Sequence, residues 1–70
     1  MERLKESVRR IQEGEWFCLA PLVLVTPGGE LDLTPGATYR KGRRFSGLDV
    51  AEALDRWYST GELPPNVRVR

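Results

Sequence analysis

The sequence predicts one α+β domain spanning residues 1–70. It should hold an N-terminal helix, a small antiparallel meander or hairpin of two to four strands, a second amphipathic helix packed on the sheet, and a short C-terminal tail or edge strand. Three observations predict this layout. Two separate segments carry apolar residues at helical spacing, a branched and aromatic stretch lies between them, and two T-P-G tripeptides punctuate the middle. Seventy residues, 40% of them hydrophobic, suffice for one core.

The first helix is predicted over residues 2–13. Leu4, Val8 and Ile11 recur at i, i+4 and i+7 among charged neighbours. Gly14 is then expected at the C′ position, where it ends the helix. Because this apolar stripe is narrow, we expect the helix to lie against the rest of the domain.

The next stretch, W-F-C-L-A-P-L-V-L-V at residues 16–25, has the composition of a strand. The segment L-V-L-V is apolar on both faces of an extended chain, which predicts the most buried strand. Pro21 cannot donate to a ladder, so sheet pairing should begin just after it. Residues 16–20 would then form either a lead-in segment or a separate short strand.

Two adjacent aromatic residues, Trp16 and Phe17, must point to opposite faces if they lie on a strand. One of them is therefore exposed unless the first helix covers it. An uncovered aromatic side chain at this place would be a natural contact point for a partner.

A β-hairpin is predicted around T-P-G-G at residues 26–29. Proline presets the second turn position and Gly28 accepts the positive φ of the third, as in a type II turn. The segment E-L-D-L at residues 30–33 follows, with its leucines on one face and its acids on the other. This alternation indicates a hairpin with one solvated face.

The second T-P-G, at residues 34–36, repeats eight residues after the first and predicts the next turn of a small meander. Residues 37–40 would hold the third strand. After a turn at Lys41-Gly42, residues 43–45 could add a short fourth arm.

The second helix has the clearest signals. Ser46 can cap it and Asp49 can close an S-x-x-D capping box, while Gly61 and the following prolines end it. Residues 62–70 then form either an edge strand around Val67 to Val69 or a flexible tail. The apolar face at helical spacing comprises Val50, Ala51, Leu54, Trp57 and Tyr58.

The composition argues against an enzyme and against a metal or cofactor site. The chain has one cysteine and no histidine, so it lacks both a zinc ligand set and the usual base for a nucleophile. Cys18, between apolar neighbours, is interpreted as a buried, inert thiol. The glycines at 28, 29 and 36 match neither phosphate-loop pattern. We expect no catalytic residues, no cofactor and no small-molecule substrate.

Charge is balanced in total but not along the chain. Eleven basic and ten acidic residues give a formal charge of +1, which argues against a dedicated polycation. Residues 15–38 carry three acids and no base, whereas residues 39–45 carry four bases and no acid. The sequence therefore predicts a basic end and an acidic flank.

Residues 39–45, Y-R-K-G-R-R-F, are the candidate binding site and are called the basic turn below. Its cations can meet phosphates or carboxylates, and its flanking rings can stack on nucleic-acid bases. The competing interpretation is a solvated turn whose rings point inward as the last core residues. The candidate binding residues are Tyr39, Arg40, Lys41, Arg43, Arg44 and Phe45.

Two functions follow from the basic turn. The first is a small non-enzymatic interaction protein that binds a protein partner or a second copy, with the acidic strand face and the basic turn pairing between copies. The alternative is nucleic-acid binding by the same turn, which the near-zero net charge disfavours. The first ten residues do not resemble a signal peptide, and the longest apolar run has ten residues, so we expect a cytoplasmic protein without membrane contact.

Overall fold

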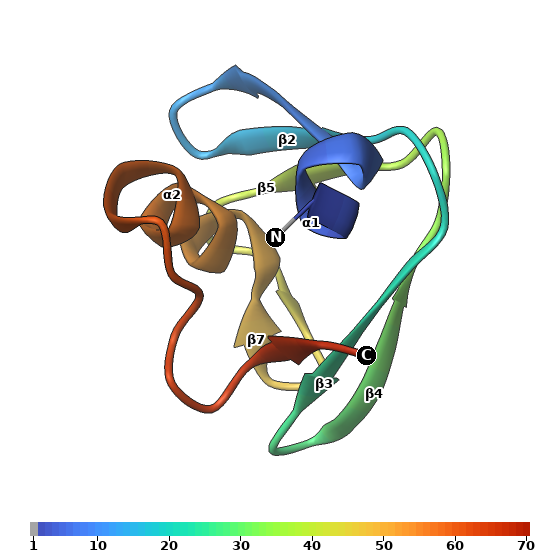
Figure 1. Ribbon diagram of the computed structural model, residues 1–70, viewed down its shortest axis with the longest axis vertical. Helices are drawn as coiled ribbons and strands as arrows, with labels where there is room; N and C mark the ends of the chain where they lie inside the picture. Colours follow the sequence, from blue (N-terminus) through green and yellow to red (C-terminus); the bar gives the residue numbers. More distant parts are fainter. Residues whose placement is uncertain (1) are drawn as a thin grey trace.

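The computed structural model describes residues 2–70, which fold into two helices and eight strands (Figure 1). In chain order the elements are α1 (Glu2–Ser7), β1 (Val8–Gln12), β2 (Glu15–Cys18), β3 (Leu22–Thr26), β4 (Gly29–Leu33), β5 (Thr38–Arg40), β6 (Arg44–Phe45), β7 (Leu48–Asp49), α2 (Val50–Thr60) and β8 (Arg68–Val69). The α+β class is confirmed, although the strands outweigh the helices more than the sequence indicated.

The strands form two three-stranded antiparallel sheets and one small hairpin. The first sheet has the order β1-β2-β5 and is called the β2 sheet; the second has the order β4-β3-β8 and is called the β3 sheet. The hairpin is formed by β6 and β7. In Figure 1 the β2 sheet lies at the top, β3 and β4 run along the lower right, and α2 lies on the left. The expected meander is wrong, because β5 pairs with β2 and not with its sequence neighbour β4.

The predicted helix over residues 2–13 is also wrong beyond Ser7, where α1 ends. Val8 begins β1 and pairs opposite Cys18, so both side chains enter the core. A short isolated helix is marginal, and this pairing offers the β-branched Val8 more burial than a helical stripe would. Gly14 lies in the β1–β2 turn with φ +75°, not at a helix end. A break in register leaves Ile11 51% exposed.

The region around Pro21 folds largely as expected. Pairing of β3 begins at Leu22, directly after the proline, and β2 is a separate short strand. The expectation that L-V-L-V forms the most buried strand is confirmed among residues 2–70, although the two faces of β3 are not equally buried. Leu22 and Leu24 are buried, but Val23 and Val25 are only half-buried on the outer face.

The β3–β4 hairpin is confirmed, with paired residues running from Leu22↔Leu33 to Thr26↔Gly29. Its turn is not the expected type II, because the positive φ, +117°, belongs to Gly29 and not to Gly28. The Thr26 hydroxyl accepts the Gly28 N–H at 3.1 Å and donates to the Gly29 carbonyl at 2.9 Å, which favours this local geometry. Gly28 is needed for space, since a Cβ there would lie 2.5 Å from the Ser46 carbonyl oxygen.

Helix α2 ends where the sequence predicted but begins three residues later than its predicted cap implied. Gly61 adopts φ +83° and donates its N–H to the Trp57 carbonyl, which confirms the predicted end. The predicted cap at Ser46 is wrong. Asp49 is the N-cap, and Ser46 lies in the β6–β7 turn with φ +52°. Tyr58, assigned to the apolar face, is 62% exposed.

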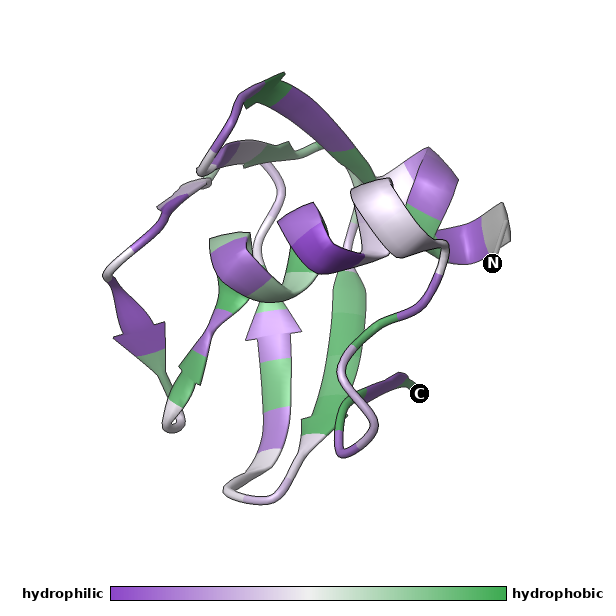
Figure 2. Cartoon of the chain, turned by 90° about the vertical axis from the view of Figure 1, so that its left-hand side faces the viewer, coloured by the Kyte–Doolittle hydropathy of each residue, from purple (hydrophilic) through white to green (hydrophobic). Residues whose placement is uncertain are grey.

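The core lies between the two sheets and α2. Figure 2 shows β3 almost entirely hydrophobic beside β4, whose hydropathy alternates. The C-terminal segment contributes to this core through Leu63 and Val67, and β8 adds an edge strand to β3, as one of the two alternatives expected for this segment. The core residues are Leu4, Val8, Trp16, Cys18, Leu22, Leu24, Leu33, Tyr39, Val50, Ala51, Leu54, Leu63 and Val67.

Candidate functional site: the basic turn and its anchors

The two rings of the basic turn point into the protein. Tyr39, in β5, is 6% exposed, and Phe45, in β6, is half-buried against the core. Their ring centroids lie 5.3 Å apart at an interplanar angle of 75°, an edge-to-face contact. The Tyr39 hydroxyl also accepts the Thr34 N–H at 3.1 Å. These rings therefore serve the core, and their faces are not offered to an external ligand.

The four cations of the turn are exposed, and they differ in their contacts. Arg40 donates from Nε to Glu15 Oε2 at 3.3 Å, and Arg44 donates from Nη1 to the Gly47 carbonyl at 3.3 Å. Neither Lys41 nor Arg43 forms an ion pair with any acid whose side chain the structure describes, in residues 3–70. The turn therefore presents positive charge that the described part of the chain does not neutralise.

The backbone of the basic turn is held by three hydrogen bonds. The Lys41 N–H donates to the Gly14 carbonyl at 2.7 Å, and the Arg43 N–H donates to the Arg40 carbonyl at 3.2 Å. The Gly42 N–H donates to Asp49 Oδ2 at 2.8 Å. Because these bonds tie it to the β1–β2 turn and to the start of α2, the turn has a defined shape before any ligand binds.

Asp49 serves two elements at once. Its Oδ1 accepts the Glu52 N–H at 3.2 Å and so caps α2, while its Oδ2 holds the Gly42 N–H. A single carboxylate thus joins the first turn of the helix to the basic turn.

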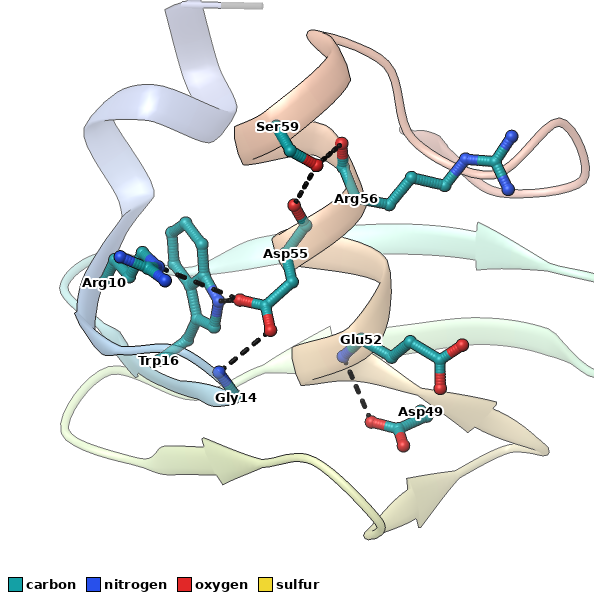
Figure 3. Close-up of polar contacts among 8 residues, drawn as sticks. All are labelled: Arg10, Gly14, Trp16, Asp49, Glu52, Asp55, Arg56 and Ser59. Carbon is teal, nitrogen blue, oxygen red and sulfur yellow. Dashed lines mark hydrogen bonds and ion pairs between the residues drawn. The ribbon is translucent and has the colours of Figure 1, made fainter.

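Asp55, farther along α2, anchors the β1–β2 turn (Figure 3). Its Oδ1 accepts the Trp16 indole N–H at 2.8 Å, and its Oδ2 accepts the Gly14 N–H at 2.8 Å. Arg10 Nε lies 3.9 Å from Oδ1, an ion pair longer than a hydrogen bond. Since the Gly14 carbonyl in turn accepts the Lys41 N–H, Asp55 positions the basic turn through Gly14.

The Arg10 guanidinium lies over the ring of Tyr58, 4.5 Å from its centroid, in cation–π geometry. This contact, together with an edge contact to Trp16, gives the exposed Tyr58 ring two packing partners. A shallow depression beside it separates the basic turn from α2. Because its lining mixes both signs of charge, it does not form an anion site by itself. The lining residues are Arg10, Glu13, Lys41, Glu52, Asp55, Arg56, Tyr58 and Ser59.

Sequence reasoning missed the anchors Gly14, Asp49 and Asp55. A weak signal for Asp55 was present, because a buried tryptophan needs an acceptor for its indole N–H. The chain alone does not indicate which acceptor this is, since Trp16 and Asp55 are 39 positions apart.

The remaining reactive group is the Cys18 thiol, which is fully buried and donates to the Ala20 carbonyl at 3.1 Å. Burial raises the pKa of the Cys18 thiol above its ordinary value, so the thiolate is disfavoured. Within residues 2–70, no group of three or more metal-ligating side chains comes together.

Comparisons of the chain with protein-family models, with curated proteins and with solved structures find no match. Neither helix in residues 2–70 is long and apolar enough to cross a membrane.

Proposed function

We propose that this protein is a small non-enzymatic interaction protein that binds an acidic surface of a protein partner through the basic turn. One observation carries the proposal. Lys41 and Arg43 are exposed and have no ion-pair partner among the described side chains of residues 3–70, yet they extend from a turn whose backbone is held at three N–H groups.

A turn of this kind binds with little loss of backbone freedom, because its shape exists before the partner arrives. Arg43 can engage a carboxylate with two parallel hydrogen bonds, and Lys41 adds a compact positive charge. Arg44 can join them by giving up an exposed bond to the Gly47 carbonyl. An interaction of this type steers encounter and weakens as salt rises.

The nucleic-acid alternative has less support from the same site. Single-strand binders stack bases on exposed rings, whereas Tyr39 and Phe45 pack against the core. The net charge of +1 also provides little general attraction to a polyanion.

The test compares the wild type with the variant Lys41→Glu/Arg43→Glu. The matched control is Lys5→Glu/Arg9→Glu, which changes net charge equally at exposed positions outside the turn. The probes are a fluorescent poly-glutamate peptide and a mixed-sequence single-stranded RNA, titrated at low salt and again at about 0.15 M salt.

We expect the peptide to bind the wild type and the control equally, and the turn variant at least about tenfold more weakly. Equal binding of the peptide to the wild type, the control and the turn variant would show that the basic turn does not carry the binding. If the wild type binds the RNA more tightly than the peptide, and the turn variant loses this RNA binding, the ligand of the basic turn is nucleic acid and not a protein.

A further inference from the structure

The β3 sheet has one buried face and one open face. Leu24 is fully buried on the inner face, and Val69 of β8 packs against the same core. Side chains alternate along a strand, so the residues beside these two face outward. On the open face β3 therefore presents Val23 and Val25, both half-buried.

The open face carries three rows of side chains. An acidic row, Glu30 and Asp32, lies on β4, and an apolar row, Val23 and Val25, lies on β3. A basic row, Arg68 and Arg70, follows β8 on the other side of β3.

The register places each valine between an acid and an arginine. Val25 is opposite Glu30 on one side and Arg68 on the other. Val23 is opposite Asp32, and its carbonyl accepts the Arg70 N–H at 3.0 Å from the other side. The stripe pattern, acidic then apolar then basic, is therefore regular along the strand.

One contact already crosses this face within the chain. Arg70 Nη1 lies 3.2 Å from Glu30 Oε1, with the two side chains 65% and 51% exposed. An ion pair this exposed holds its members weakly, so both charges remain available to an external partner.

A symmetric dimer requires a surface that is complementary to itself. A two-fold axis running along β3 would lay the acidic row of each copy over the basic row of the other and pack the two apolar rows together. A two-fold axis running across the strands would lay acid over acid and base over base. The charge pattern thus favours the first arrangement and disfavours the second.

We propose that the open face of the β3 sheet is a homodimer surface in which two copies pair face to face about an axis along β3. This goes beyond the proposed function and uses no residue of the basic turn. The face measures roughly 17 Å by 14 Å, from five residues of strand length and three strands of width. That area is well below the roughly 800 Å² per partner of a stable interface, so the dimer should form only at concentrations of about 10 µM to 1 mM.

The experiment reverses the charge of one row at a time. The first variant is Glu30→Lys/Asp32→Lys and the second is Arg68→Glu/Arg70→Glu. Sedimentation equilibrium at low salt should show wild-type mass rising toward a dimer as concentration rises, while each variant alone stays monomeric. An equimolar mixture of the two variants should dimerise, because their unlike rows then face each other.

Two controls separate geometry from net charge. The quadruple variant, with both rows exchanged, keeps the wild-type net charge and should dimerise like the wild type. The variant Glu6→Lys/Glu13→Lys has the same net charge as the first row variant but keeps the wild-type acidic row. On its own it should dimerise like the wild type, because both rows are intact. Mixed with the second row variant, it should form no heterodimer, because one of the two row pairs then places acid over acid.

Wild type that remains monomeric up to about 1 mM would overturn the proposal, as would association that neither row variant reduces. Self-association lost only in Lys41→Glu/Arg43→Glu would assign it to the basic turn and overturn the proposal as well. Binding of poly-glutamate by the quadruple variant, which keeps the wild-type net charge, reports on the basic turn separately, so the two proposals can fail independently.

Discussion

The β2 sheet and the β3 sheet are similar in size and both bury side chains in the core, but they differ in their polar contacts with the rest of the protein. The β2 sheet is tied to α2 by polar contacts: Asp55 holds Trp16 and Gly14, and Asp49 holds the loop after β5. The β3 sheet is a local hairpin with an added edge strand, and it is positioned mainly by its buried leucines. The sheet beside the candidate site therefore combines apolar burial with specific hydrogen bonds to α2, whereas the other sheet relies on apolar burial.

The largest expected effect tests burial in the β3 sheet. Leu24→Ala removes a fully buried side chain and should lower the free energy of unfolding by about 2–5 kcal/mol. A domain of this size has roughly 3–5 kcal/mol available, so much of the variant should be unfolded at 25 °C. Far-ultraviolet circular dichroism with urea titration measures this. Leu19→Ala, at a position that is 50% exposed, should lower the free energy of unfolding by less than about 1 kcal/mol. Equal losses for the two variants would show that burial of Leu24 does not hold the β3 sheet.

A smaller effect is expected where the β2 sheet meets α2. Asp55→Ala leaves the Trp16 indole N–H and the Gly14 N–H without their acceptor, which should cost about 2 kcal/mol. Tryptophan fluorescence should also shift as water reaches the indole. Glu52→Ala, an exposed change on the same helix, serves as the control. A variant as stable as this control would show that the polar tie does not hold the β2 sheet.

The smallest effect on stability is expected at Asp49, where one carboxylate joins the helix to the basic turn. Asp49→Ala removes the cap and should cost about 1 kcal/mol. Asp49→Asn keeps one accepting oxygen, so it can retain the cap while losing the bond to the Gly42 N–H. We therefore expect near wild-type stability but weaker binding of the poly-glutamate peptide. Unchanged peptide binding would show that a fixed turn is not required.

Local patterns were sufficient wherever neighbours in the chain are also neighbours in space. The β3–β4 hairpin follows from T-P-G-G and the alternation after it, and the end of α2 follows from Gly61. The turn at Lys41-Gly42 was also located correctly, between β5 and β6. In each case the deciding interaction spans only a few residues, so the sequence shows it directly.

Tertiary structure decided the rest, because the deciding contacts join distant residues. Val8 belongs to a strand since β2 offers it a partner, although its spacing from Leu4 suits a helix. β5 leaves the hairpin and pairs with β2, and this pairing carries Tyr39 into the core. The pairing of β5 with β2 also turns the rings of the basic turn inward and brings the Lys41 N–H to the Gly14 carbonyl. The sequence by itself thus determined where the cations lie along the chain, whereas long-range burial and the acceptors Asp49 and Asp55 decided how the turn is held and what it presents.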